Sequence, residues 1–358
     1  MNPGKYTSLV LLAALAAGGC NVVGPRAIDK GQFSYNEVIN RTDNEQLLLN
    51  LVRLKYRDTP FFLEVSSVLT QYSLQSTAGI GRSRTTGLPT DRSLDLGLSY
   101  EENPAVSYAP LQGEKFVRQL LSPISLETML LLYHSGWSIE RIFRCSIQQL
   151  GPLKNAPGAS GPTPEQAPEF REFTRAAKLL RELQVQGKIH FGAVQNGQGQ
   201  HMVLRFSPEA AASPIARELR KLLGAGQDAT DLHLATGAAA PGQIPVVTRS
   251  LMGVLFYLSH SIEVPEDDIE EGRVTLTRNS DDSPFDWSEV TEGLLQVRTG
   301  SWKPGNASVR IRYRGAWFYV DDSDLPSKST FSFLTQLLAL QSGEVKSSAP
   351  VLTIPIGG

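Results

Sequence analysis

Three aspartates near the carboxyl end, Asp321, Asp322 and Asp324, form a group of carboxylates with the chemistry to hold a cation or a polar ligand. Carboxylate oxygens are the ligands that hard cations prefer. Aspartate is also typical of turns, where its side chain accepts hydrogen bonds from the nearby backbone. The sequence favours turn chemistry here and leaves a ligand site as the alternative. The acidic run from Glu263 to Glu271 lacks the spacing of a calcium loop and is interpreted as a solvated turn.

Two histidines are the other candidates for metal binding. His190 and His201 lie in predicted strands on either side of a tight turn at Asn196 and Gly197, so we expect them to face each other. Structural zinc normally takes four ligands, and two imidazoles make an incomplete site. The sequence therefore predicts a polar cross-strand pair and no metal.

Side chains with the chemistry of a nucleophile are few. Ser327 and Lys328 are adjacent, so they point in different directions, and their spacing is not the Ser-x-x-Lys of penicillin-recognising enzymes. Cys145 lies on an apolar helix face, which is typical of a small buried hydrophobe. No nucleophile elbow, zinc-protease motif, phosphate-binding glycine loop or dinucleotide fingerprint occurs in the sequence. We predict a non-catalytic protein without a cofactor, and rank a periplasmic hydrolase third among the functions.

The amino-terminal stretch indicates the compartment. An apolar run from Leu9 to Ala17 follows Lys5 and precedes Gly18, Gly19 and Cys20. This is the anatomy of a secretory signal peptide. The run is shorter than the roughly 20 apolar residues that a membrane-spanning helix needs.

The residues before Cys20 also carry a resemblance. Ala17-Gly18-Gly19-Cys20 resembles the lipobox of bacterial lipoproteins, although Ala17 stands where leucine is usual. The resemblance implies a signal peptide over residues 1–19, acylation of the Cys20 thiol by diacylglycerol and palmitate, and a tether over residues 20–41. Asn21, which is not the aspartate of inner-membrane retention, implies the outer membrane and its periplasmic face. An ordinary secretory signal with a chance cysteine is the alternative.

Composition excludes some classes of partner. The 358 residues are 41% hydrophobic and 20% charged, with a net charge of −2, as in an ordinary globular protein. Nucleic acid is not an expected partner because phosphate neutralisation requires excess basic charge. With Cys20 acylated, Cys145 is the one remaining cysteine, so no internal disulfide is expected. The expected partners are membrane lipid, through Cys20, and another envelope protein, and a homo-oligomer is compatible with the sequence.

A long stretch of alternating residues predicts a β-hairpin. Apolar residues alternate with polar ones from Thr70 to Ile80 and again from Leu94 to Tyr100, which is the period of a pleated strand. A turn centred near residue 86 pairs Tyr72 with Tyr100 and Leu74 with Leu98. In one interpretation this amphipathic ribbon, residues 70–101, covers the protein's own core.

In the other interpretation, the hairpin is one subunit's contribution to a shared transmembrane barrel, with tyrosines at one membrane interface. That arrangement is similar in kind to the curli-export lipoprotein channel, with which this sequence shares no motif. The main candidate functions are thus an outer-membrane scaffold or interaction protein and, alternatively, a subunit of an oligomeric export pore.

The rest of the chain predicts an α+β protein: helical segments with the long hairpin, a helix-plus-β-wing unit, and a carboxyl-terminal antiparallel sheet with helices. A capping box at Thr42 and Glu45 predicts where the first helix begins. Apolar residues around most of its circumference predict that it is wedged between other elements, and the cations at 53, 55 and 57 suit the helix dipole in its last turn. Serines at 125 and 138 predict two more helix starts, and the helix that begins at 138 is expected to run through Leu150. A closing strand is predicted at 351–354. The expected divisions are a helix, hairpin and helical unit at 42–153, a Pro/Gly linker or ordered excursion at 154–168, the wing unit at 169–223, a linker at 224–245 and an α+β domain at 246–358.

The carboxyl-terminal domain carries a second resemblance. The run from Tyr313 to Asp324, followed by Ser327 to Phe331, resembles a group of uncharacterised bacterial envelope lipoproteins, as do residues 47–73 and 112–121. The resemblance implies no known activity. Arg314 and Gly315 predict a hairpin turn, after which Trp317 and Tyr319 share one strand face.

Overall fold

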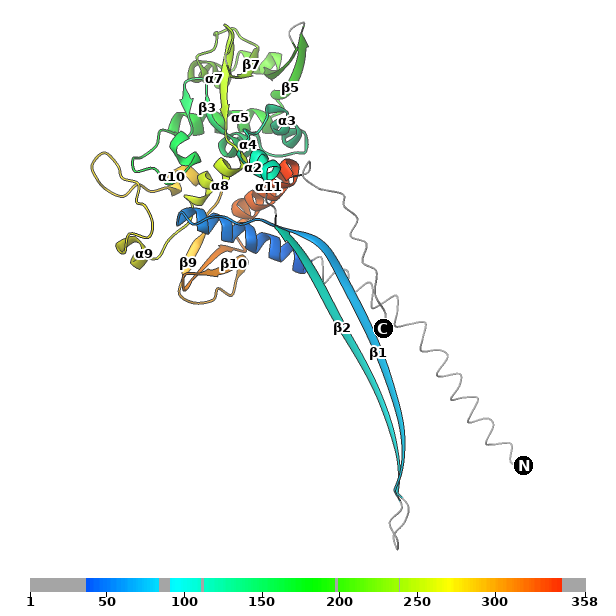
Figure 1. Cartoon of the computed structure of the whole chain (residues 1–358). Helices are drawn as coiled ribbons and strands as arrows, with labels where there is room; N and C mark the ends of the chain where they lie inside the picture. The colour runs from blue at the N-terminus through cyan, green and yellow to red at the C-terminus, as the bar shows by residue number, and fades with distance from the viewer. Residues whose placement is uncertain (1–36, 84–90, 111–112, 197–198, 238, 343–358) are drawn as a thin grey trace. The chain divides into compact units, whose positions relative to one another are not determined.

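A computed structural model describes residues 37–83, 91–110, 113–196, 199–237 and 239–342. Helices occur together with a six-stranded mixed sheet and a three-stranded antiparallel sheet, which confirms the α+β class (Figure 1). Residues 61–111 form one compact unit, and the described residues on either side of that segment form a second, globular unit.

The hairpin unit consists of β1 (Leu63–Ser83) and β2 (Asp91–Pro110), which pair with each other to form a two-stranded antiparallel sheet. The ladder runs from Leu63 opposite Pro110 to Ser83 opposite Asp91, with a register shift between Val65 and Ser67. The predicted hairpin is therefore confirmed, and it is longer at its base than predicted.

The six-stranded sheet combines segments from distant parts of the globular unit. Its order is β4 (Leu153–Lys154), β3 (Ile147–Leu150), β8 (Gln243–Thr248), β7 (Asp231–Thr236), β6 (Gly199–Phe206) and β5 (Ile189–Asn196). β7 and β8 are parallel and the other neighbours are antiparallel. Alternate residues of the central strands are buried, which shows that one face of the sheet packs against the core.

The structure corrects one of the predicted linkers and distinguishes between the two interpretations of the other. Residues 224–245 contain β7 and the start of β8, so this stretch is not a linker, and its Ala- and Gly-rich part connects the two parallel strands. Residues 154–168 pair with another loop through Gln166 and Arg278 and contain η1 (Pro157–Ser160), so they are an ordered excursion. The wing strands β5 and β6 belong to the same sheet as β3 and β8, and the segments predicted as separate units share one core.

Five helices of the globular unit begin at serines whose hydroxyls accept a backbone N–H. Ser125, Ser138, Ser207, Ser213 and Ser250 cap their helices in this way, which confirms the predictions for Ser125 and Ser138. The helices are α2 (Glu114–Leu121), α3 (Leu126–His134), α4 (Ile139–Ser146), α5 (Arg171–Val185), α6 (Pro208–Ala211), α7 (Pro214–Leu223), α8 (Leu251–Ser259), α9 (Glu266–Glu270), α10 (Ser288–Thr291) and α11 (Leu325–Ser342). The helix predicted to run through Leu150 stops at Ser146 because residues 147–150 pair with β8 instead.

The three-stranded sheet lies in the carboxyl-terminal part and has the order β10 (Ala307–Tyr313), β11 (Ala316–Asp321) and β9 (Arg298–Gly300). Arg314 and Gly315 have φ angles of 47° and 89°, the left-handed turn that was predicted. Phe318 and Val320 are fully buried, whereas Trp317 and Tyr319 are half-buried on the opposite face. The strand predicted at 351–354 lies outside the described residues.

The first helix covers residues 37–55 in the part of the chain that the structure describes. The predicted start at Thr42 is wrong, because Thr42 lies inside the helix and its hydroxyl donates to the Val38 carbonyl, at 2.9 Å. Leu48, Leu51 and Val52 are fully buried, so this helix is wedged into the core as expected.

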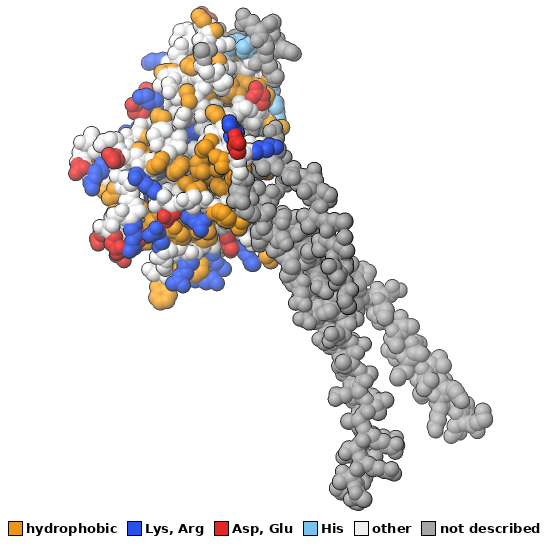
Figure 2. All heavy atoms as spheres, viewed as in Figure 1, with side chains coloured by type: hydrophobic (Ala, Val, Ile, Leu, Met, Phe, Trp, Pro, Cys, Tyr) orange, Lys and Arg blue, Asp and Glu red, His pale blue; other side chains and the backbone are white. Residues whose placement is uncertain are grey.

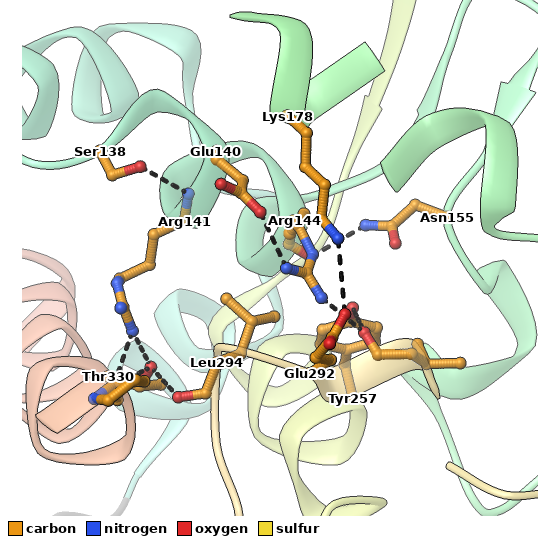
Figure 3. A network of polar contacts seen from close by, with 12 residues as sticks. Ser138, Glu140, Arg141, Arg144, Asn155, Lys178, Tyr257, Glu292, Leu294 and Thr330 are labelled. Carbon is orange, nitrogen blue, oxygen red and sulfur yellow. Dashed lines mark hydrogen bonds and ion pairs between the residues drawn. The ribbon is translucent and has the colours of Figure 1, made fainter. Parts of the chain in front are cut away.

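Arginines of α4 connect the amino-terminal helices to the carboxyl-terminal segment (Figure 3). The Arg144 side chain is buried and donates to Glu140 Oε1, at 3.0 Å, and to the Val290 carbonyl, at 2.9 Å. Arg141 donates to the Thr330 hydroxyl of α11. These contacts tie α4 to segments 146 and 189 residues away, and they explain why the described residues from 246 onward do not form a separate unit.

Hydrophobic side chains gather on one face of the globular unit, over α2 and α11 (Figure 2). The exposed ones there include Val117 and Leu121 of α2 and Leu340 of α11. Among the described residues, no helix is both long and apolar enough to cross a membrane.

A buried tyrosine–aspartate contact joins the first helix to the acidic run. The Tyr56 hydroxyl donates to Asp268 Oδ2 at 2.5 Å, and Arg273 donates to Asp268 Oδ1 at 2.5 Å. Asp268 is 4% exposed, so the acidic run is not a simple solvated turn. Burial alone would raise the pKa of Asp268, but the hydrogen bonds from Tyr56 and Arg273 outweigh burial and lower it.

Substitution of Tyr56 by phenylalanine tests this contact. We expect Tyr56→Phe to lower the free energy of unfolding by about 1.5–3 kcal/mol at pH 7, the range for a hydrogen bond to a charged group. Because the folded pKa of Asp268 lies below its unfolded value, its contribution is present above about pH 4 and is lost as pH falls through the folded pKa. In denaturant unfolding, the difference in the free energy of unfolding between the wild type and Tyr56→Phe should therefore be smaller at pH 3 than at pH 7. Tyr319→Phe, which removes a half-buried hydroxyl of β11, is the control.

Candidate functional site

The globular unit contains a cavity of about 910 Å³ formed by segments that are far apart in the sequence. Its wall includes Lys55 from the first helix, the residues that follow α8, the loop and helix around α10, and the start of α11. The lining residues include Lys55, His260, Glu263, Phe285, Asp286, Trp287, Glu289, Glu292, Asp324 and Ser327. The fold, rather than any local motif, brings these side chains together.

Lys55 is the cation of this cavity. It lies in the last turn of the first helix and is 6% exposed. Burial lowers the pKa of its ammonium to about 8, and no neighbouring carboxylate raises it. No hydrogen bond or ion pair joins this ammonium to another group in the described part of the chain.

His260 and Trp287 form a stacked pair on the cavity wall. Their ring centroids are 4.1 Å apart and their planes differ by 17°. Trp287 is held by a hydrogen bond from its Nε1 to the Thr277 hydroxyl, at 3.0 Å. His260 is 2% exposed, and neither of its ring nitrogens has a hydrogen-bond partner among the described residues.

Burial, followed by the nearby charge of Lys55, lowers the pKa of His260 to about 3. The backbone of Ala159 opposes this decrease, but it forms no hydrogen bond of normal geometry with the ring. The imidazole is therefore neutral at physiological pH.

The aspartate cluster at the β11–α11 junction carries turn chemistry. Asp321 accepts hydrogen bonds from the Ser323 backbone and hydroxyl, at 2.9 and 2.5 Å. Asp322 pairs with the Lys328 ammonium, at 2.7 Å. Asp324 accepts from the Ser327 backbone, at 3.1 Å, in the first turn of α11. Each carboxylate therefore has a local donor, and the arrangement matches the turn interpretation of this cluster.

Ser327 is not arranged as a nucleophile. It is 1% exposed, its hydroxyl donates to Asp324 Oδ2 at 2.6 Å and accepts from the Gln296 backbone at 2.9 Å. Lys328 points to Asp322 instead of Ser327. The Ser327 hydroxyl therefore stabilises the first turn of α11 through its hydrogen bonds.

His190 and His201 are not cross-strand partners. His190 lies opposite Arg205, and His201 lies opposite Val194. The ladder pairs Asn196 with Gly199, so its register differs by four positions from the one that would place the two histidines opposite each other. The ring of His190 instead lies 5.8 Å from that of His134 in α3. In the part of the chain that the structure describes, no three His, Cys, Asp or Glu side chains are grouped so as to hold a metal ion.

The hairpin register differs from the prediction by two residues. Leu74 lies opposite Tyr100, whereas Tyr72 lies opposite Glu102 and Leu98 opposite Ser76. The predicted pairs Tyr72 with Tyr100 and Leu74 with Leu98 are therefore wrong. Beyond the register shift at its base, the ladder pairs residues whose numbers sum to 174, where the prediction paired residues whose numbers sum to 172, and this offset of two keeps even-numbered residues opposite even-numbered residues.

Of the two cysteines, the structure describes Cys145 alone. Cys20, the predicted lipidation residue, lies outside the described residues. Cys145 is fully buried in α4, and burial raises the pKa of its thiol to about 11. Cys145 is thus the small buried hydrophobe that the sequence predicts.

Sequence reasoning missed Lys55 and His260. Lys55 was one of three cations interpreted as partners of the helix dipole, and His260 stood at the end of an apolar helix. One usable signal was the apolar residues around the whole circumference of the first helix, because a cation on a fully buried helix has no solvent to reach.

Comparisons with known proteins identify no relative of this chain. No protein-family model, no curated protein and no solved structure matches the chain.

Proposed function

We propose that this chain is a lipid-anchored protein at the periplasmic face of the outer membrane, with a non-catalytic scaffold or protein-interaction role that its hairpin performs. The observation that supports this role is the pairing of β1 and β2. They form a sheet of two strands, about 20 residues each, within a unit of their own.

Such a hairpin is incomplete by itself. A two-stranded sheet is marginally stable at best in water, and three or more strands or a packed face are needed for independent stability. Each outer edge of the ladder from Leu63 to Pro110 presents a row of backbone donors and acceptors with no third strand among the described residues. Addition of a strand from another envelope protein satisfies such an edge, a recurrent mode of recognition.

The anchor is proposed from the amino-terminal sequence. The apolar run before Cys20 and the small residues Gly18 and Gly19 support processing and acylation at that thiol. Several acyl chains on one residue make anchoring stable, since each buried methylene contributes about 0.8 kcal/mol.

Substitution of Cys20 by serine tests the anchor. We expect Cys20→Ser to move the protein from the outer-membrane fraction to the soluble periplasmic fraction and to abolish incorporation of radiolabelled palmitate. Cys145→Ser is the matched control and should keep both label and membrane association, because Cys145 is buried. Unchanged fractionation of Cys20→Ser, or absence of label on the parent protein, contradicts the anchor.

The open edges also favour a second candidate, a subunit of an oligomeric export pore. A hairpin with two free edges can pair with one copy of itself on each side, and a ring of such hairpins closes without an edge. A barrel strand needs about 9–11 residues to cross a bilayer, and β1 and β2 are about twice that length. The oligomeric state after detergent extraction separates the two candidates.

A further inference from the structure

The charges that line the cavity do not balance. Each acidic side chain on its wall already has a donor from the protein, whereas the Lys55 ammonium has no acceptor in the described part of the chain. The donors are Gln296 Nε2 to Glu263 (3.1 Å), Arg171 to Glu289 (2.9 Å), Lys178 to Glu292 (3.4 Å), the Ser288 N–H to Asp286 (2.8 Å) and the Ser327 hydroxyl to Asp324 (2.6 Å). The charge left without a counter-charge is positive.

A second polar group on the same wall lacks partners. The buried imidazole of His260 has no hydrogen bond to either nitrogen among the described residues. Buried polar groups in native proteins are nearly always paired, so an unpartnered ring on a cavity wall indicates that something else occupies the space.

The remaining wall suits a flat apolar body. Trp287 is fixed by Thr277, and Phe285 meets it edge-on with centroids 5.3 Å apart. The volume of about 910 Å³ lies within the range of small-molecule sites, which are mostly apolar with a few polar groups that orient the ligand.

We infer that this cavity binds a small organic anion whose acidic head group pairs with Lys55 and hydrogen-bonds His260, while its aromatic or aliphatic body lies against Trp287 and Phe285. This activity is additional to the hairpin's proposed role, since every residue of the site belongs to the globular unit.

Two matched fluorescent probes test the inference on the full-length protein in detergent. 8-Anilinonaphthalene-1-sulfonate carries a sulfonate, and N-phenyl-1-naphthylamine is nearly the same molecule without it. We expect Lys55→Met to weaken binding of the sulfonate probe about 10- to 100-fold, the worth of a hydrogen bond to a charged group. Binding of the neutral probe should change less than about twofold.

Lys221→Met is the control variant, because Lys221 is an exposed lysine of α7. It should leave the affinity for both probes unchanged. Equal affinity of Lys55→Met and the wild type for the sulfonate probe would overturn the inference, and so would an equal loss for both probes. Lys55→Met removes a buried charge that has no counter-charge, so we expect its melting temperature to match or exceed that of the wild type.

A titration of the wild-type protein gives an independent test that needs no variant. The preference for the sulfonate probe over the neutral probe should decrease as pH rises above about 8, where the Lys55 ammonium loses its proton. His260, whose pKa is lowered to about 3, is already neutral in this range. A preference that stays constant from pH 7 to pH 10 contradicts the proposed pairing.

Discussion

Arg249→Met is expected to leave the globular unit unfolded or barely folded at 37 °C. The guanidinium is 1% exposed and donates to the carbonyls of Arg144, Cys145 and Ile147, at 3.1, 3.2 and 2.7 Å. It also donates to the Asn155 carbonyl and the Ser160 hydroxyl and lies 4.0 Å from the centroid of the Tyr257 ring. One side chain thereby joins α4, β3, η1 and α8.

The expected loss in the free energy of unfolding is large because the substitution removes the donor and leaves buried carbonyl acceptors in place. The carbonyls of Arg144 and Ile147 keep a second donor, Asn155 Nδ2, whereas those of Cys145 and Asn155 lose the guanidinium. Each buried carbonyl left without a donor costs about 1–3 kcal/mol, and a desolvated cation–π contact adds about 2 kcal/mol. The sum exceeds about 4 kcal/mol, at the extreme of single substitutions and comparable to the whole stability of many domains. Replacing a buried charge by a hydrophobe is harmless only when its partners are replaced with it.

Thermal unfolding monitored by circular dichroism measures this effect. Arg217→Met, at an exposed arginine of α7, is the control and should stay within about 0.5 kcal/mol of the wild type. Arg249→Lys keeps the charge but not the planar fork of donors, so we expect it to melt between the wild type and Arg249→Met. A melting temperature of Arg249→Met close to that of the wild type would show that the carbonyls find other donors.

Replacement of residues 64–109 by an Asn-Gly turn is expected to abolish assembly while leaving the globular unit intact. Leu63 and Pro110 are partners in the ladder, so the two ends of the deleted segment already lie next to each other. A two-residue turn connects antiparallel neighbours without strain. Because the hairpin is a separate compact unit, unfolding of the remainder should change by no more than about 0.5 kcal/mol.

The readout is the particle extracted in detergent from wild-type and variant cells. A ring-shaped, heat-sensitive oligomer of the wild type that the variant no longer forms supports the pore. A wild type that is monomeric but loses a co-purifying envelope protein in the variant supports the scaffold role. Identical particles and identical co-purifying proteins from both chains contradict each of these functions.

A shorter hairpin in the correct register is the matched control. Residues 72–75 lie opposite residues 99–102, so removing both segments keeps the pairing of the flanking residues. About 16 residues per strand then remain, more than the 9–11 that a bilayer requires. We expect this variant to assemble, whereas removal of residues 72–75 alone shifts the register and should not assemble.

Local signals of the sequence predict much of the fold. Serine caps at 125 and 138, the left-handed turn at Arg314 and the alternation in the hairpin all depend on interactions within a few residues. The same signals fail where pairing with a distant segment determines the secondary structure. Residues 147–150 look helical but pair with β8, and the Ala- and Gly-rich stretch before Pro245 conceals a strand of the central sheet.

The candidate site could not be predicted from the sequence. Lys55 and His260 are 205 positions apart, and their lack of partners depends on the packing of three separate segments around them. The aspartate cluster, in contrast, has donors within six positions of each carboxylate, and local signals of this kind can be recognised in a sequence.

The buried thiol of Cys145 makes this chain convenient for labelling experiments. With a pKa of about 11 and no exposed surface, it reacts slowly with maleimides and methanethiosulfonates at neutral pH. Because acylation blocks the Cys20 thiol in the proposed lipoprotein, a cysteine introduced at one position of the hairpin would thus carry a spin label or a fluorophore almost alone. Distances between neighbouring copies then become measurable without first removing the native thiol.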